Sequence, residues 1–216
     1  MNELKVLSYD LRKHVVDMII AGKGGHIGGD MSVMEILVEL YMKQMNISPE
    51  NKDSDNRDRF VLSKGHSVES YYAVLAKKGF FPMEEVISTF SQFGSKFIGH
   101  PNNKLPGIEM NSGSLGHGLP VCVGMAMAGK MDRKDYRVYV VVGDGELAEG
   151  SVWEGAMAAS HYCLDNLCAV VDRNRLQISG CTEDVMGHDD LHERFRSFGW
   201  HVIDVADGND IDQLDA

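Results

Sequence analysis

The sequence has 216 residues, of which 44% are hydrophobic and 25% are charged, as is usual for a globular domain. Its net charge of −11 argues against a nucleic-acid partner, because phosphate backbones are bound by basic faces. No apolar run approaches the ~20 residues of a membrane span, the charged N-terminus does not resemble a signal peptide, and the four cysteines show no CxxC spacing. We therefore expect a cytoplasmic protein with reduced thiols that binds neither nucleic acid nor membrane.

The first half of the sequence predicts helices around one short strand. Apolar residues at helical spacing predict a helix over residues 2–21. A glycine-rich segment follows, and Ser32 with Glu35 three residues later predicts the capping box of a second helix. A short strand is expected at 59–62, then a Gly-His turn and two helices, the second with Pro82 in its first turn.

The second half alternates strands with helices. A long polar, glycine-rich stretch precedes it, and such loops in a compact domain are usually functional. The predicted strands are 138–142, 168–171 and 200–205, and the predicted helices are 121–131, 151–161 and 191–198. Alternation of this kind predicts an α/β fold with a doubly wound, mostly parallel sheet and helices on both faces. We expect a single domain over residues 1–216, truncated at its C-terminal end, because the sequence stops inside what should be the next helix.

Polar residues follow two neighbouring strands at the points where these strands should end. The strand at 138–142 runs into Gly143, Asp144 and Gly145, and Asn174 follows the next strand, about one βαβ unit later. Ligands of open parallel sheets bind at the carboxyl ends of the strands. A carboxylate and an amide oxygen beside a diphosphate suit Mg²⁺. A lone Gly-Asp-Gly is usually only a turn, but Asn174 at the matching place favours a metal and diphosphate site.

This pair of motifs resembles the thiamine diphosphate fold, in which Gly-Asp-Gly and a later Asn bind Mg²⁺ and the cofactor's diphosphate. More specifically, the chain is similar to the N-terminal, diphosphate-binding half of transketolase over nearly its whole length. The matching stretches, in order, are "GKGGHIGGDMSVMEILVELY", "DRFVLSKGHSVESYYAVLAKKG", "IGHP", "NSGSLGHGLPVCVGMAMAGK", "GDGELAEGSVWEGAM" and "LDNLCAVVDRNRLQISG".

The resemblance implies a set of cofactor and metal contacts. Mg²⁺ would be held by the side chains of Asp144 and Asn174 and by the backbone carbonyl of Leu176. The implied thiamine diphosphate contacts are Gly145 and Asn174 at the diphosphate end, Gly113, Ser114 and Leu115 at the aminopyrimidine, Ile178 at the thiazolium, and His66.

Three histidines match the active-site histidines of the family. They are His26, His66 and His100, and each lies in a glycine-bearing segment that suits close approach of a ligand. An imidazole near neutral pH can hydrogen-bond sugar hydroxyls or a developing alkoxide. The resemblance therefore implies catalytic roles for all three, with His66 near the cofactor and the other two on the ketose.

Three further residues remain open at this point. Glu149 and Glu154 match acidic residues near a subunit interface, but acids are also common in the first turn of a helix. His117 stands where long transketolases commonly carry Gln, a variant that resembles the split, two-subunit enzymes and leaves the identity of the substrate in doubt.

The resemblance also implies a partner. In the family, the glutamate that activates the cofactor belongs to a pyrimidine-binding domain, which is absent here. We therefore expect a separate C-terminal subunit, which would join this one in a heterotetramer-like enzyme that transfers a two-carbon ketol unit from a ketose or ketose phosphate to an aldose. The alternatives are another thiamine diphosphate enzyme, similar to 1-deoxyxylulose-5-phosphate synthase or a 2-oxo acid dehydrogenase component, or a noncatalytic partner-binding domain.

Overall fold

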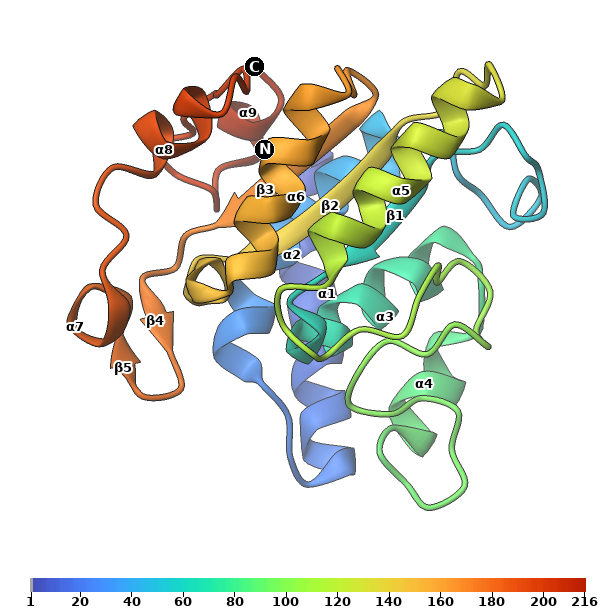
Figure 1. Ribbon diagram of the computed structural model, residues 1–216. Coiled ribbons are helices and arrows are strands. Elements are labelled where there is room, and N and C mark those ends of the chain that lie inside the picture. The colour runs from blue at the N-terminus through green and yellow to red at the C-terminus, as the bar shows by residue number, and fades with distance from the viewer. Residues whose placement is uncertain (1) are drawn as a thin grey trace. The chain divides into compact units, whose positions relative to one another are not determined.

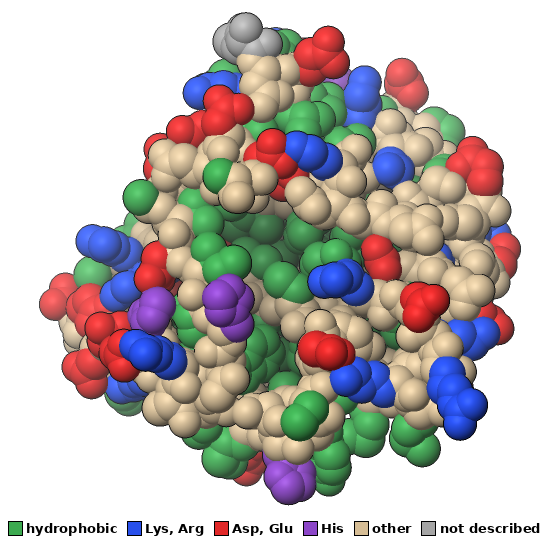
Figure 2. All heavy atoms as spheres, turned by 90° about the horizontal axis from the view of Figure 1, so that it is seen from above, with side chains coloured by type: hydrophobic (Ala, Val, Ile, Leu, Met, Phe, Trp, Pro, Cys, Tyr) green, Lys and Arg blue, Asp and Glu red, His purple; other side chains and the backbone are tan. Residues whose placement is uncertain are grey.

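The computed structural model of the protein describes residues 2–216, which group into two compact units. The first unit comprises residues 2–57, 65–113 and 205–216, and the second comprises residues 58–64 and 114–204. Within residues 2–216, no helix combines the length and apolar character needed to cross a membrane. Acidic and basic side chains are interspersed on the face shown in Figure 2.

The second unit is built on a parallel sheet. Its strands are β1 (Arg59–Leu62), β2 (Val138–Gly143) and β3 (Leu167–Asp172), in the order β1-β2-β3. All pairings are parallel, and Gly143 at the end of β2 lies opposite Asp172 at the end of β3. The central strand is almost wholly buried, which explains its near-continuous run of valines. The prediction of an α/β fold with a parallel sheet is confirmed.

Helices and a small hairpin complete the second unit. Helix α5 (Gly118–Met131) packs on all three strands, and α6 (Gly150–His161) packs against α5. In Figure 1, these two helices run beside each other along β2. The remaining elements are η3 (Gly145–Ala148), β4 (Leu176–Gln177), β5 (Gly180–Cys181), α7 (Thr182–Met186) and α8 (Leu191–Ser197).

Two tryptophans anchor the loops of the second unit. The Trp153 indole donates to the carbonyl of Leu147 (2.8 Å), and the Trp200 indole donates to the carbonyl of Ala156 (3.0 Å). Both rings lie near Phe195 of α8, with centroid separations of 5.2 and 5.8 Å. Each indole therefore combines apolar contact with a satisfied N–H, which is the usual requirement for a partly buried tryptophan.

The first unit is a helical cluster. Its elements are α1 (Glu3–Gly22), α2 (Ile27–Glu39), η1 (Leu40–Gln44), η2 (Gly65–Ser67), α3 (Val68–Lys78), α4 (Met83–Thr89) and α9 (Ile211–Leu214). Helices α1, α2 and α3 pack against one another in pairs. Their fully buried side chains include Val15, Met18, Met34, Leu37 and Tyr72, which form the core of this unit.

The predicted start of the second helix is wrong. Helix α2 begins at Ile27, and the Ser32 hydroxyl donates to the carbonyl of Gly29 (3.0 Å) within the helix. Glu35 does not complete a capping box either, because its carboxylate is paired with Arg12 of α1. Burial of the helix against α1 and α3 extends it through the glycines, so tertiary packing overrides the local capping signal.

The strand predicted at 200–205 is also wrong. No strand is present there among the described residues, and the side chain of Ile203 is 75% exposed. An apolar run marks where a strand can form, but its backbone groups still need a neighbouring strand for pairing. The helix predicted at 121–131 is confirmed, although it begins earlier, at Gly118.

A buried ion pair lies at the carboxyl ends of the strands. Lys64 Nζ lies 2.6 Å from Asp172 Oδ2, and the two side chains are only 1% and 7% exposed. Because Lys64 follows β1 and Asp172 ends β3, the pair spans the end of the central strand. Removing one partner of such a pair leaves an uncompensated buried charge, which is strongly destabilising.

We expect Lys64→Met to reduce the free energy of unfolding by about 3–5 kcal/mol, because the buried Asp172 carboxylate loses its cation. Urea denaturation measures this loss. Adding Asp172→Asn should recover part of it, because position 172 then carries no charge that has lost its cation. Lys13→Met serves as the control, since Lys13 pairs with Asp10 on an exposed helix surface and should contribute little. Equal stability of Lys64→Met and Lys13→Met would contradict the proposed weight of the buried pair.

Candidate active site

Asp144 lies at the end of β2, where three donors fix its carboxylate. Its side chain is buried, and Oδ1 accepts a hydrogen bond from the backbone N–H of Gly145 (2.9 Å). Oδ2 accepts from the N–H of Arg175 (2.8 Å) and from the hydroxyl of Thr182 (3.0 Å). These bonds tie the loop that follows β3 to the end of β2 and set the direction of the carboxylate.

Asn174 belongs to the same hydrogen-bonded unit as Asp144. It is half-buried, and its side-chain oxygen accepts from the N–H of Leu176 (3.0 Å). The intervening Arg175 has a left-handed backbone (φ +61°), an uncommon conformation for a residue other than glycine. This turn allows the N–H of Arg175 to donate to Asp144. Because Arg175 directly follows Asn174 in the sequence, this hydrogen bond holds the two predicted side-chain ligands near each other.

The chemistry of these groups fits a magnesium ion. Asp144 offers a carboxylate, Asn174 an amide oxygen and Leu176 a backbone carbonyl, and Mg²⁺ prefers such hard oxygen ligands. An ionised carboxylate has about four acceptor positions, and three are used here, which leaves room for one metal bond. No group of three His, Cys, Asp or Glu suited to a metal occurs among residues 2–216, as expected for a set with only one such side chain.

Gly145 sits in a tight position beside this site. A Cβ added there would lie 3.0 Å from the Cβ of Gln177 in β4, so a larger residue would require Gln177 to move by a few tenths of an ångström. Its N–H donates to Asp144 in this structure, so the diphosphate contact expected at Gly145 would have to share that donor.

The other cofactor contacts expected in the second unit lie on its surface. The side chain of Leu176 is 66% exposed, and that of Ile178, in the turn between β4 and β5, is fully exposed. Ser114 is exposed and Leu115 is half-buried in the turn that precedes α5. Their assignment to the cofactor remains a prediction.

Glu146 is a buried residue that the sequence reasoning missed. Its carboxylate accepts hydrogen bonds from the hydroxyl of Ser63 and from the N–H groups of Gly116 (2.8 Å) and Gly143 (3.1 Å). The Ser63 oxygen in turn accepts from the N–H of Gly118 (3.1 Å). Burial raises the pKa of Glu146, and these hydrogen bonds oppose that rise. Glu146 thus fastens the turn before α5 to the end of β2. The only sequence signal was an acid directly after Gly-Asp-Gly.

The three predicted histidines form a cluster in the first unit. The ring centroids of His26 and His66 are 5.6 Å apart, and those of His26 and His100 are 6.0 Å apart, both with edge-to-face geometry. His26 is exposed, while His66 and His100 are half-buried. Burial, followed by the nearby charge of His26, lowers the pKa of His100. The cluster therefore presents imidazoles that can donate or accept hydrogen bonds near neutral pH.

Glycines and a tyrosine support the histidine cluster. Gly113 has φ +140°, and a Cβ there would lie 2.7 Å from the ring of His100, so this position requires glycine both for its backbone and for its space. A Cβ at Gly29 would meet the ring of His66 at 3.3 Å. The hydroxyl of Tyr72 lies 3.1 Å from the carbonyl oxygen of His100 and holds that segment against α3.

The three residues that the sequence left open lie at helix starts or on helix surfaces. Glu149 is the N-cap residue of α6, but its side chain makes no capping hydrogen bond. Glu154 is exposed on the same helix, and His117 is exposed at the N-cap of α5. The structure places none of them in the histidine cluster or among the groups that surround Asp144.

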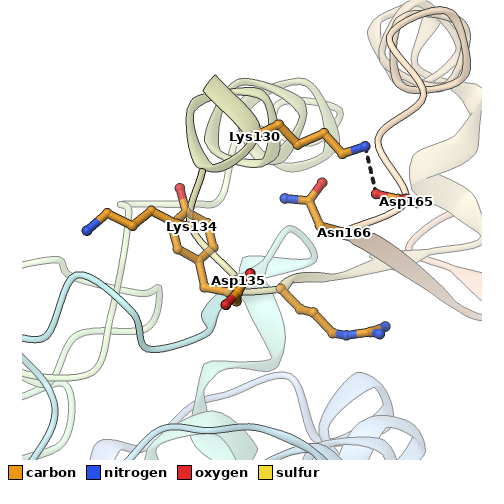
Figure 3. A pocket seen from close by; sticks show the side chains of 7 residues that line it. Lys130, Lys134, Asp135, Asp165 and Asn166 are labelled. Atoms are coloured by element: carbon orange, nitrogen blue, oxygen red, sulfur yellow. Dashed lines mark ion pairs between the residues drawn. The ribbon is translucent and has the colours of Figure 1, made fainter. Parts of the chain in front are cut away.

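A polar pocket lies at the opposite edge of the sheet, beside the amino ends of β2 and β3 (Figure 3). Lys130 reaches across to Asp165 (2.7 Å), while the Lys134 side chain points away from that pair. Ligands of open parallel sheets bind at the carboxyl ends of the strands, so this pocket is not the candidate site.

A comparison with known families gives one match over nearly the whole chain. Residues 5–216 match the family described as "Transketolase, thiamine diphosphate binding domain".

Two bacterial relatives are similar over most of their own length. The chain is 49% identical over 211 residues to one of the subunits of the apulose-4-phosphate transketolase of Phocaeicola vulgatus, covering 98% of this chain and 74% of that protein. It is 42% identical over 191 residues to "6-deoxy-6-sulfo-D-fructose transketolase subunit SqwG" of Clostridium sp., covering 88% and 69%.

Longer transketolases are similar over about a third of their length. Human transketolase is 39% identical over 212 residues, which cover 98% of this chain and 34% of that protein. The crystal structure of transketolase from Campylobacter jejuni superposes with a TM-score of 0.92 at 31% identity, covering 99% of this chain and 35% of that one. The family match, the relatives and the shared fold agree: the chain belongs to the transketolase family of transferases and carries its thiamine diphosphate-binding domain.

Proposed function

We propose that this chain is the cofactor-binding subunit of a two-subunit transketolase, which transfers a two-carbon ketol unit from a ketose or ketose phosphate to an aldose. The observation that carries the proposal is the pair of polar side chains that follow β2 and β3, Asp144 and Asn174, which we call the strand-end unit. The hydrogen bond from the N–H of Arg175 to Asp144 connects the two segments. The two bacterial relatives described above are each named as one subunit of a transketolase, which supports a divided enzyme.

The strand-end unit would hold the metal and the diphosphate. Asp144, Asn174 and the carbonyl of Leu176 would bind Mg²⁺, and the N–H of Gly145 would lie near the diphosphate. Thiamine diphosphate, when bound, supplies an electron sink for the two-carbon fragment. This chain contributes a carboxylate whose direction is fixed before binding, because three donors already orient it.

The histidine cluster would handle the sugar. His26 and His100 would hydrogen-bond the ketose hydroxyls and its carbonyl oxygen, with His66 toward the cofactor. The lowered pKa of His100 keeps its imidazole neutral at physiological pH, so that it can accept a proton or hydrogen-bond without adding charge.

A partner chain would supply the pyrimidine-binding domain, and two copies of each chain would form a heterotetramer. We further propose a cytoplasmic location, where the cysteines Cys122, Cys163, Cys168 and Cys181 would remain reduced. The ketose is best sought among unusual sugars as well as common sugar phosphates, since relatives are named for apulose 4-phosphate and 6-deoxy-6-sulfo-D-fructose.

We expect Asp144→Asn to weaken thiamine diphosphate binding at saturating Mg²⁺ by at least about 100-fold, because an anionic metal ligand is lost. Isothermal titration calorimetry in the presence of the partner measures the affinity. Thr182→Val is the matched control, because it removes one hydrogen bond to Asp144 but leaves the carboxylate in place. Unchanged affinity in Asp144→Asn, or an equal loss in Thr182→Val, would argue against a metal ligand at Asp144.

We expect His100→Asn to lower kcat/KM for the ketose, because the variant loses about 2–4 kcal/mol of transition-state stabilisation. The cofactor affinity should stay constant. The wild-type kcat/KM should fall only as the pH drops below the ordinary histidine value of 6.5, because the pKa of His100 lies under it. Asparagine does not titrate, so the variant should lose that acidic limb. A loss of cofactor affinity instead would place His100 in the cofactor site.

We expect this chain alone to show no ketose cleavage at saturating cofactor and Mg²⁺, because the activating glutamate of the family lies on the partner. Activity should appear when the partner chain is titrated in, and it should saturate at equal stoichiometry. A donor panel that includes pyruvate, read by mass spectrometry, separates ketol transfer from the other thiamine-dependent reactions. Cleavage by the single chain would overturn the two-subunit proposal.

A further inference from the structure

Two buried carboxyl groups lie beside the histidine cluster in the first unit, and one of them accepts a hydrogen bond from the N–H of His26. Asp30 lies in the first turn of α2 and Glu69 in the first turn of α3, and both side chains are fully buried. Buried acids are costly unless they are paired with a cation or hydrogen-bonded. The sequence reasoning gave neither residue a role.

Each carboxyl group has one oxygen with a defined partner. Asp30 Oδ1 accepts from the N–H of Ser70 (2.9 Å), and Glu69 Oε1 accepts from the N–H of His26 (3.3 Å). The other two oxygens, Asp30 Oδ2 and Glu69 Oε2, are buried without a hydrogen-bond partner in the structure. Two ionised carboxylates cannot satisfy each other, because both only accept hydrogen bonds. One added proton turns an acceptor into a donor, which allows a hydrogen bond between the side chains of Asp30 and Glu69.

The electrostatics favour a single proton at this pair. Burial, followed by the negative charge of Glu69, raises the pKa of Asp30 to about 8. Burial also raises the pKa of Glu69, while hydrogen bonds, including one from Asp30, and the charge of His26 oppose that rise. The other titratable group that senses the pair is Tyr72 of α3, whose own pKa is raised by burial and then by Glu69. Like charges in one low-dielectric site cannot both ionise, so the proton resides on Asp30.

We propose that Asp30 and Glu69 share one proton at neutral pH, with the Asp30 acid donating to the Glu69 carboxylate, and that Glu69 thereby acts as a positioning residue for His26. The pair connects the first turns of two helices to the backbone of a cluster histidine. The positioning role of Glu69 rests on the proposed role of the histidines in sugar binding.

The packing around Gly25 supports the positioning role. A Cβ added at Gly25 would lie 2.4 Å from Glu69 Oε1, so the chain just before His26 rests directly on the carboxylate. His26 in turn touches both other rings of the cluster. A shift of the Glu69 carboxylate therefore reaches His26 through its N–H and through the preceding glycine.

Infrared difference spectroscopy tests the shared proton directly. At pH 7, the wild-type minus Asp30→Asn spectrum should contain a carbonyl band of a protonated carboxyl group. The control difference, wild type minus Asp132→Asn, removes an exposed residue and should contain only ionised carboxylate bands. In Glu69→Gln the Asp30 acid band should disappear at a lower pH than in wild type, because the neighbouring negative charge is gone. Absence of the acid band at pH 7 would overturn the proposal.

Thermal denaturation against pH gives a second, independent readout. Between pH 4 and pH 8, unfolded Asp30 loses its proton while folded Asp30 keeps it, given an ordinary pKa of 3.8 and a folded pKa of about 8. The unfolded state then binds fewer protons, so stability falls as the pH rises through this range. Asparagine has no proton to lose, so the melting temperature of Asp30→Asn should rise relative to wild type from pH 4 to pH 8. A difference that is constant with pH would contradict the shared proton.

Kinetics of the assembled two-subunit enzyme test the positioning role. Glu69→Gln should lower kcat/KM for the ketose about 10-fold, while thiamine diphosphate affinity stays constant. Asp30→Asn, which keeps a donor toward Glu69, should change kcat/KM much less. An unchanged kcat/KM in Glu69→Gln, with the infrared and thermal results as expected, would overturn the positioning role alone. The spectroscopic and thermal results do not depend on catalysis, so their failure is distinct from a failure of the proposed function.

Discussion

The parallel register that sets Gly143 opposite Asp172 is the constraint on which the second unit depends. It brings the ends of β2 and β3 to the same edge, and with them the acids Asp144 and Asp172. Glu146 follows in the next turn. Three buried carboxyl groups at one sheet edge would repel one another and lose their hydration, so each one needs its own means of compensation.

The chain compensates these acids in two ways, with a cation for one of them and with neutral hydrogen-bond donors for the other two. Asp172 is paired with the ammonium of Lys64, Glu146 accepts from backbone N–H groups and a serine hydroxyl, and Asp144 accepts from two N–H groups and a threonine. Each device also joins segments that are distant in the sequence. The same bonds that make the charges tolerable therefore fix the loops that surround Asp144.

Sequence reasoning succeeded where the signal was local. Strand β2 could be predicted because a fully buried strand is a near-continuous apolar run, and the structure places Asp144 and Asn174 just after the ends of β2 and β3, as expected. The histidine cluster was predicted only through the resemblance to transketolase, since nothing in the spacing of His26, His66 and His100 indicates that they meet.

The rest depends on contacts that no local pattern encodes. Lys64, Glu146, Asp30 and Glu69 look like ordinary surface residues in the sequence, and only the tertiary fold buries them. The capping signal at Ser32 was overridden by helix packing. The apolar segment at 200–205 satisfied the strand pattern but finds no strand to pair with among the described residues.

The strand-end site and the histidine cluster differ in how their buried acids are compensated, and this difference affects which ligands each can bind. At the strand end, the ammonium of Lys64 pairs with Asp172, while Asp144 is held by neutral donors that leave its carboxylate able to attract a cation. A diphosphate brings further negative charge to a chain whose net charge is already −11. Under the proposed function, Asp144 would therefore hold a metal ion, whose positive charge would offset the negative charge of the diphosphate. Beside His26, by contrast, the proposed shared proton halves the charge of the Asp30–Glu69 pair and leaves the histidine cluster suited to a ligand that is held by hydrogen bonds.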